Sequence, residues 1–368
     1  MKFIHLGDLH IGKRLYETSL LEDQRWTLDF IASEVERRRP DAVFIAGDVY
    51  DRAMPSAEAV TLCGDFLVRL AASGAKVFVI GGNHDSQERL AFARDMLARE
   101  GLILSAPYGG KLEKYDVGDV RVWLMPHIRP KEAEDFFEGA SFSSTEDAVA
   151  AILAREELDG GRANVLLAHQ FVTAAGQEAE RSDSEVEPVG GESAVDAKLF
   201  DAFDYVALGH LHAPQRVGRD SVRYAGSPMK YSFSEARHKK SFVAGSIEGK
   251  DLRLELVPIP VKRDLRDLQG ELANILAAAE PTEDYVRVTL TDEVKPASPM
   301  ERLAAVYPGI LRLEFVQRGG GPEPRAAMAL REPLELFAEF YEKMNGTPLN
   351  EEMLRMARDA MNAVLEND

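Results

Sequence analysis

The sequence predicts an α/β protein whose core is a sandwich of two β-sheets flanked by helices. Apolar runs of strand length alternate with helical patterns from the start of the chain to about residue 260, which is typical of an α/β fold. Later in this region the strand-like runs follow one another more closely, so we expect mixed sheets. A small α+β unit and a C-terminal pair of helices are expected to follow.

The elements of the core are expected in the following order. Helices are predicted over 21–38, 56–73, 86–99, 145–158 and 195–202. Early strands are predicted at the apolar runs 3–6, 42–46, 77–80 and 165–168. Further strands are predicted over 111–117, 120–125, 204–208, 222–226, 241–247 and 252–259. Residues 174–193 are rich in Gly, Glu, Asp and Ser and predict a mobile loop, which either shapes the mouth of a site or only connects two elements.

Pro258 and Pro260 mark the end of a first domain, residues 1–260. Beyond them, helices are predicted over 264–279 and 298–306 and strands over 285–290 and 310–316, and together these elements form a small α+β domain, 264–318. A run of glycine and proline then predicts a linker over 319–326.

Residues 327–368 are predicted to form a helix-loop-helix, with amphipathic helices over 333–344 and from about 350 onwards. Two short helices cannot bury a core of their own, so they need another surface. The second helix carries Met353 and Met356 on its apolar side, and methionine-rich faces pack well against other helices. The surface belongs either to a partner protein or to the first domain of the same chain.

Composition narrows the class of protein. The 368 residues are 45% apolar and 29% charged, as in ordinary globular proteins. The sequence has no apolar run of about 18 residues and no cationic and apolar leader, so neither a membrane span nor a signal peptide is expected. Cys63 is the only cysteine, which excludes an internal disulfide and fits a cytoplasmic location.

Five short polar blocks carry the chemistry, and they contain five of the eight histidines. The blocks are Asp8-Leu9-His10, Gly47-Asp48-Val49-Tyr50-Asp51, Gly82-Asn83-His84-Asp85, His169 and Gly209-His210-Leu211-His212. Each lies where a predicted strand ends. Asp8 and His10, on backbone expected to be extended, would point to the same side. A single block is often only a turn or a core histidine, but five at strand ends predict one shared site.

The mixture of carboxylates, imidazoles and an amide predicts a site for two divalent metal ions. Two such ions about 3.5–4 Å apart can hold the attacking and leaving oxygens of a phosphodiester and lower the pKa of a bridging water. Nitrogen and oxygen ligands without a thiolate favour Mn²⁺, with Fe, Zn and Co as alternatives. Mg²⁺ fits less well, because it prefers oxygen ligands and keeps its waters.

In this order the blocks resemble the calcineurin-like metallophosphoesterase superfamily, which uses the two-sheet fold. Within it, the chain is similar to the SbcD family of bacterial nucleases, on its opening residues 1–12 and on 226–235 followed by Lys239-Lys240-Ser241. The resemblance covers essentially the whole chain. It implies hydrolysis of DNA phosphodiesters by metal-bound hydroxide, as an exonuclease on duplex ends and an endonuclease on hairpins or single strands, in DNA replication, recombination and double-strand-break repair.

The resemblance also implies a role for each site residue. One metal would be held by Asp8, His10, Asp48 and His212, and the second by Asp48, Asn83, His169 and His210. His84 would stabilise or protonate the leaving oxygen, and the Asp51 carboxylate would orient it by a hydrogen bond. Some archaeal relatives have a second histidine in place of Asp51, and the Asp form also occurs in the phosphatase branch, so Asp51 does not discriminate between the branches. Asp85 is expected only to cap the next helix.

Partners are likewise implied by the resemblance. The α+β domain would cap the site and choose how DNA approaches, unless it only packs against the core. Residues 327–368 would bind the coiled coil of an SbcC-type ATPase. The chain would be a homodimer within a heterotetramer, joined through apolar residues of two helices, namely Leu62, Phe66, Leu90 and Leu97.

The net charge of −18 opposes unaided binding to DNA, because affinity for phosphates comes from Lys and Arg. Bound metals would add positive charge locally. A basic cluster also follows His212, and its members predicted to bind DNA are Lys230, Arg237, Lys239 and Lys240. The alternative for this cluster is an ordinary solvated face.

Two other functions remain open. A small-molecule or cyclic-nucleotide phosphodiesterase of the same superfamily would share every ligand, but it should end near residues 260–280, and this chain continues for about a hundred residues more. A scaffold that has lost catalysis should lack ligands, and here all seven predicted ligands and His84 are present.

Overall fold

The computed structural model describes residues 1–185 and 194–316, together with 337, 338, 341, 347, 349, 350 and 353–357. The chain divides into two compact units, Met1–Glu314 and Phe315–Asp368. The predicted linker, 319–326, and most of the predicted tail helices lie outside the described residues. Within the described residues, no helix is both long enough and apolar enough to cross a membrane.

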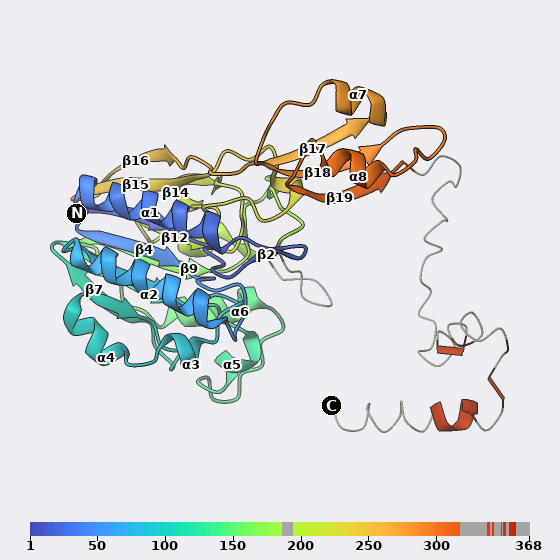
Figure 1. Cartoon of the computed structure of the whole chain (residues 1–368). Helices are drawn as coiled ribbons and strands as arrows, with labels where there is room; N and C mark the ends of the chain where they lie inside the picture. Colours follow the sequence, from blue (N-terminus) through green and yellow to red (C-terminus); the bar gives the residue numbers. More distant parts are fainter. Residues whose placement is uncertain are drawn as a thin grey trace. The chain divides into compact units, whose positions relative to one another are not determined.

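Two six-stranded sheets form the core of the first unit (Figure 1). The first sheet has the strand order β16-β15-β1-β4-β5-β6. These strands are β1 (Lys2–Leu6), β4 (Ala42–Ala46), β5 (Lys76–Ile80), β6 (Leu102–Leu104), β15 (Ser241–Glu248) and β16 (Asp251–Pro258). The second sheet has the order β13-β14-β12-β9-β8-β7. Its strands are β7 (Glu113–Val117), β8 (Val120–Met125), β9 (Ala163–His169), β12 (Tyr205–Gly209), β13 (Gln215–Val217) and β14 (Arg219–Tyr224).

The central strands of both sheets are parallel, which decides where the site lies. β1, β4, β5 and β6 run parallel to one another, as do β8, β9, β12 and β14. Their facing sides share one buried cluster that includes Phe3, Phe44, Phe78, Leu167 and Tyr205. Strands buried on both sides are expected to be nearly continuous apolar runs, and β4 and β9 are buried at every residue. The carboxyl ends of these strands therefore meet at one edge.

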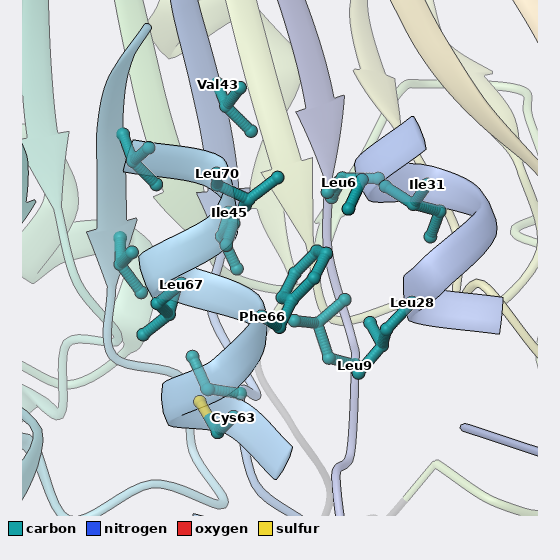
Figure 2. Close-up of a cluster of buried hydrophobic side chains, with 14 of the residues drawn as sticks. Leu6, Leu9, Leu28, Ile31, Val43, Ile45, Cys63, Phe66, Leu67 and Leu70 are labelled. Atoms are coloured by element: carbon teal, nitrogen blue, oxygen red, sulfur yellow. The ribbon is translucent and has the colours of Figure 1, made fainter. Parts of the chain in front are cut away.

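Helices cover the outer faces of the sandwich. α1 (Leu21–Arg38) and α2 (Ala57–Ala72) pack on the first sheet, and Figure 2 shows Phe66 of α2 between that helix and Leu9. Cys63 is buried in the same cluster. On the second sheet lie α5 (Pro130–Glu134) and α6 (Thr145–Ala154). The outer helices thus bury the second side of each sheet.

A separate three-stranded sheet follows, with β17 (Leu265–Gly270), β18 (Tyr285–Leu290) and β19 (Ile310–Phe315), and with α7 (Leu272–Ala277) and α8 (Pro299–Ala304). Polar contacts join it to the start of α1. Arg263 Nη1 lies 3.0 Å from Asp23 Oδ2, and the Tyr285 hydroxyl donates to the same carboxylate at 2.8 Å. Lys230 Nζ also lies 2.7 Å from Asp264 Oδ1.

Three predicted helices differ from the structure. Residues 265–270 are a strand, although 264–279 was expected to be one helix. Leu265, Leu268, Leu272 and Ile275 recur at helical spacing, but residues 265–270 pair in parallel with β18. The predicted 86–99 helix is broken into α3 (Gln87–Leu90), α4 (Arg94–Leu97) and η1 (Ala98–Glu100), because Ala93 has a left-handed φ of 58°.

The third exception is 195–202, where β11 (Val195–Asp196) pairs with β10 (Val172–Thr173) and a short 3₁₀ helix, η2 (Ala197–Phe200), replaces the expected α-helix. The Asp196 side chain caps this turn by accepting a hydrogen bond from Lys198 N. A two-stranded hairpin, β2 (Arg14–Leu15) and β3 (Thr18–Ser19), follows the first polar block.

Candidate metal centre

Five strand ends deliver the polar blocks to one place. β1 leads to Asp8 and His10, β4 to Asp48, β5 to Asn83 and His84, β9 ends on His169, and β12 leads to His210 and His212. Three overlapping groups have ligand atoms within 4.8 Å of one another. They are Asp8, His10 and His212; His10, Asp48 and His84; and Asp8, Asp48 and His169. The parallel strands bring together residues about 200 positions apart.

The backbone at the first block is not extended, so that part of the prediction is wrong. Asp8 and His10 have left-handed φ angles of 54° and 42°, and Asp48 has 50°. Such angles are uncommon and strained outside glycine. Hydrogen bonds between the two loops hold them, from Asp8 N to Gly47 O at 3.1 Å and from His10 N to Asp48 O at 2.9 Å. The loops after β1 and β4 are thereby locked together.

Two glycines allow the blocks to approach so closely. A Cβ at position 209 would lie 1.8 Å from the Ala46 carbonyl oxygen, and a Cβ at position 82 would lie 2.1 Å from Asp48 Oδ1. Any other residue would therefore force the loops apart. The glycines at the edges of the blocks are part of what makes the site possible.

The ligand atoms of Asp8, His10 and His212 lie close together, and they lack hydrogen-bond donors that would satisfy them. His10 Nε2 lies 3.1 Å from His212 Nε2. Asp8 Oδ2 is buried and has no hydrogen-bond partner. Burial raises the pKa of the Asp8 carboxyl well above its usual range. Two imidazole nitrogens and an unpartnered carboxylate oxygen are the surroundings that a divalent cation would satisfy.

Asn83, His169 and His210 form a second set of close donor atoms beside Asp48. His169 Nδ1 faces the Ala46 carbonyl oxygen at 2.8 Å, so this nitrogen carries a proton and Nε2 is left facing the site. That Nε2 lies 2.9 Å from Asn83 Oδ1, which is also 3.2 Å from His210 Nδ1. Burial would lower the pKa of His169, but the charge of Asp48 outweighs it and raises the pKa to about 9. The site thus attracts positive charge at this point.

Asp48 lies between the two groups. Its Oδ2 is 3.5 Å from His10 Nε2 and 3.5 Å from His169 Nε2. Its Oδ1 accepts a hydrogen bond from His84 N at 2.9 Å. Burial would raise the pKa of Asp48, but the neighbouring histidines, first of all His169, hold it well below its usual range. One carboxylate can therefore serve both groups.

His84 is held by a different atom of Asp51 from the one predicted. His84 Nδ1 lies 2.9 Å from the backbone carbonyl oxygen of Asp51. The Asp51 carboxylate instead forms an ion pair with Lys13 Nζ at 2.8 Å and lies 3.9 Å from His10 Nδ1. His84 Nε2 is 4.0 Å from Asp48 Oδ2, and the side chain is 14% exposed. It can therefore meet a substrate at the rim of the site.

Asp85 does not cap the next helix. Its carboxylate accepts from Val49 N and Tyr50 N after β4, and from Gly82 N after β5. Burial, followed by the nearby charge of Asp48, raises its pKa to about 6. Asp85 thus binds two of the polar blocks to each other.

Sequence reasoning missed several residues that support the ligands. Ser184 Oγ lies 2.7 Å from His212 Nδ1, and Glu185 Oε1 accepts from His212 N at 2.8 Å. Gln24 Nε2 donates to His10 O at 2.7 Å. Ser184 and Glu185 belong to the segment expected to be a mobile loop, and nothing in its polar composition distinguishes them. Residues 186–193 of that segment lie outside the described residues.

The residues predicted to bind DNA separate into two kinds. Arg237 and Lys239 are exposed and lie in the segment before β15. Lys230 is largely buried and donates to Ala236 O and Asp264 Oδ1 at 2.7 Å each. Lys240 is buried and forms an ion pair with Glu235 at 2.6 Å. A contact of Lys240 with DNA is therefore excluded in this structure, because its ammonium group faces inward.

Fold and site together define a metal-dependent phosphoesterase. The model of the calcineurin-like phosphoesterase family matches residues 1–214, and the chain belongs to this family. A second model, described as the type 5 capsule protein repressor C-terminal domain, matches residues 261–345.

Within that family, the chain falls among the SbcD proteins. The SbcD nuclease of the SbcCD complex from Staphylococcus epidermidis is 30% identical over 324 residues, which cover 86% of each chain. Among solved structures, a dimetal phosphatase from Danio rerio is 11% identical, with a TM-score of 0.41 over 71% of this chain and 99% of the other.

Proposed function

We propose that this chain is the nuclease component of an SbcCD-type complex and cleaves phosphodiester bonds of DNA with two divalent metal ions. The observation that carries the proposal is the pair of inward-facing ligand groups joined by Asp48 at the strand ends. The similarity to an SbcCD nuclease over most of both chains supports the choice of DNA as substrate.

The donor atoms indicate how two metals would be held. Asp8, His10 and His212 would hold one ion, Asn83, His169 and His210 would hold the other, and Asp48 would contact both. The short distances between these donor atoms support the assignment. The two ions would polarise the phosphodiester and lower the pKa of a water between them. Mn²⁺ is the proposed metal, because the donors are nitrogen and oxygen without a thiolate.

His84 is proposed as the group that assists the leaving oxygen. Because the Asp51 carbonyl accepts from Nδ1–H, the imidazole is fixed in orientation and its Nε2 faces the Asp48 side of the site. When both nitrogens carry a proton, Nε2–H can donate to the leaving oxygen as the bond to phosphorus breaks. Asp51 contributes through its backbone, and its carboxylate holds Lys13 at the rim.

Exposed residues of the same helices, rather than those predicted, are proposed for the homodimer contact. Leu62 and Phe66 are buried in the core, and Leu90 and Leu97 pack against it. The apolar side chains left exposed on these segments are Val60, Val68, Phe92 and Met96. Large exposed apolar side chains on one surface favour a protein contact, which is why these four residues are proposed. We propose that residues 327–368 bind the SbcC-type ATPase, and that Arg237 and Lys239 contact DNA.

The proposal is tested with the purified chain, end-labelled duplex and hairpin DNA, Mn²⁺ or EDTA, and cyclic AMP as a parallel substrate. Manganese-dependent shortening of the duplex and opening of the hairpin are expected. Turnover of cyclic AMP with intact DNA would instead support a small-molecule phosphodiesterase. The family match at residues 261–345, beyond the phosphoesterase domain, favours the nuclease.

A further inference from the structure

The outward-facing nitrogen of His212 enters a buried polar network. Its Nδ1 lies 2.7 Å from Ser184 Oγ. The Ser184 hydroxyl donates to Glu235 Oε1, and that oxygen lies 3.5 Å from His212 Nδ1. All three residues are buried. Ser184 and Glu235 belong to none of the ligand groups, yet both contact the proposed ligand His212.

Lys240 keeps Glu235 ionised. Its Nζ lies 2.6 Å from Glu235 Oε2 and also donates to His212 O and Ser227 Oγ, both at 2.8 Å. An ammonium group at this distance favours the ionised carboxylate. Because Tyr231 N also donates to this carboxylate, at 3.2 Å, the buried charges are satisfied on several sides, as a buried ion pair requires.

The direction of the hydrogen bonds follows from the chemistry of each group. An ionised carboxylate can only accept, so the Ser184 hydroxyl donates its single proton to Glu235. Toward His212 Nδ1 the Ser184 oxygen can then only accept, so Nδ1 must carry the proton. His212 Nε2 consequently presents a lone pair, and it is this nitrogen that faces His10 Nε2 at 3.1 Å.

We propose that Ser184 and Glu235 are positioning residues that fix the Nδ1-protonated tautomer of His212 and so prepare its Nε2 to bind a divalent metal ion. This inference rests on the proposed function, because it assigns a support to one of the two metal positions. Partners of this kind orient metal-binding histidines in many proteins and raise their basicity. The inference also gives a role to two residues of the Gly226–Lys240 segment, because Glu235 and Lys240 are structural supports of the site.

The loop that carries Ser184 is held on both sides. Glu185 Oε1 accepts from His212 N at 2.8 Å, and Asp183 N donates to the exposed Ser234 Oγ at 2.9 Å. Ser234 Oγ also lies 2.7 Å from Ser232 Oγ, but it contacts neither Ser184 nor His212. Removing this hydroxyl is therefore expected to loosen the loop without deleting a contact among Ser184, Glu235 and His212. Ser234→Ala is therefore a control for a purely structural effect of loop anchoring.

The test compares Ser184→Ala, Ser184→Thr and Ser234→Ala with the unmodified chain. Long-range ¹H–¹⁵N spectra of histidine-labelled, metal-free protein report which nitrogen of His212 is protonated, and Mn²⁺ titration followed by electron paramagnetic resonance reports each metal position. Ser184→Ala is expected to mix the two tautomers and to weaken one Mn²⁺ position about 10–100-fold while sparing the other. Ser184→Thr, which keeps the hydroxyl, should retain the single tautomer of His212 and the binding of Mn²⁺ at both positions.

Two results would overturn the proposal: a purely Nδ1-protonated His212 with unchanged Mn²⁺ binding in Ser184→Ala, or the same losses in Ser234→Ala. The spectra of the metal-free protein separate this inference from the proposed function. If the unmodified chain bound no Mn²⁺ the proposed function would fail, while the tautomer of His212 would still decide whether Ser184 and Glu235 act as inferred.

Discussion

Asp85 shows how a single buried side chain can join two parts of the site. Its carboxylate accepts hydrogen bonds from Val49 N at 3.1 Å, Tyr50 N at 3.0 Å and Gly82 N at 2.9 Å. The loops after β4 and β5 are thus tied together at the point where they present their ligands. Hydrogen bonds from N–H groups to a charged acceptor are among the stronger ones in proteins.

Replacing Asp85 by alanine is expected to lower the free energy of unfolding by about 2–4 kcal/mol, because three partly buried N–H groups lose a charged acceptor. Urea unfolding at neutral pH measures the change. Asp95→Ala is the matched control. The Asp95 carboxylate is 94% exposed, so its removal should change stability by less than about 0.5 kcal/mol. Equal unfolding midpoints for the two variants would contradict this role of Asp85.

At the scale of residues, the sequence predicts side chains better than it predicts their partners. Asp, His and Asn at strand ends are recognisable because few other types bind metals. The contact between His84 and the Asp51 carbonyl could not be predicted, since every residue has a carbonyl. Ser184 and Glu235 are equally ordinary in the sequence, and only the folded chain brings them to His212.

At the scale of elements, the strands of the core are the best-predicted part. Their apolar, β-branched runs are distinctive, and all five strands leading to the polar blocks lie where the sequence predicts them. The short elements of the small sheet are less well predicted. In β17 the leucine spacing suits a helix. The segment forms a strand because it pairs with β18, and the local sequence pattern gives no information on that pairing.

β1 carries a second histidine, His5, that is buried between the sheets and lies outside the ligand groups. Its Nδ1 is 2.9 Å from the Tyr205 hydroxyl and its Nε2 is 3.1 Å from Leu208 O. Burial lowers the pKa of His5 from 6.5 to about 3. The folded chain therefore keeps His5 neutral at a pH where the unfolded chain protonates it.

His5 should make the fold sensitive to acid. Between about pH 6.5 and pH 3 the unfolded state binds one more proton at this residue, so stability falls as pH falls, with a slope of about 1.4 kcal/mol per pH unit. In His5→Gln, whose amide can replace both hydrogen bonds, that part of the slope should disappear. Urea unfolding from pH 7 to pH 4 measures it. Parallel curves for the two proteins would show that His5 does not titrate in this way.

At the scale of the whole molecule, the charge of the chain limits what it can do alone. A net charge of −18 repels DNA, and of the four predicted DNA-binding residues Lys230 and Lys240 are occupied by internal contacts. Divalent metals would supply compensating positive charge at the strand ends. Much of the affinity for long DNA is therefore expected to come from the ATPase partner.

Deletion of residues 325–368 tests whether DNA cleavage and ATPase binding depend on different parts of the chain. The shortened chain is expected to retain manganese-dependent cleavage of short DNA, because every proposed ligand lies before residue 213. It should no longer co-purify with the SbcC-type ATPase, whereas the full chain should. Co-expression of both forms with the ATPase, followed by size-exclusion chromatography, measures the difference. A complex that survives the deletion would place the ATPase contact elsewhere.

The two-metal mechanism is tested most sharply by the Mn²⁺ bound per chain together with DNA cleavage, measured on the unmodified protein, His84→Ala and Asp48→Ala. Two Mn²⁺ per chain are expected in the unmodified protein and in His84→Ala, with cleavage by the latter reduced about 10²–10⁴-fold, because His84 assists the leaving group and binds no metal. Asp48→Ala should lose both metal binding and cleavage. Loss of a metal from His84→Ala would contradict the role given to His84, and a single Mn²⁺ in the unmodified protein would contradict the two-metal mechanism.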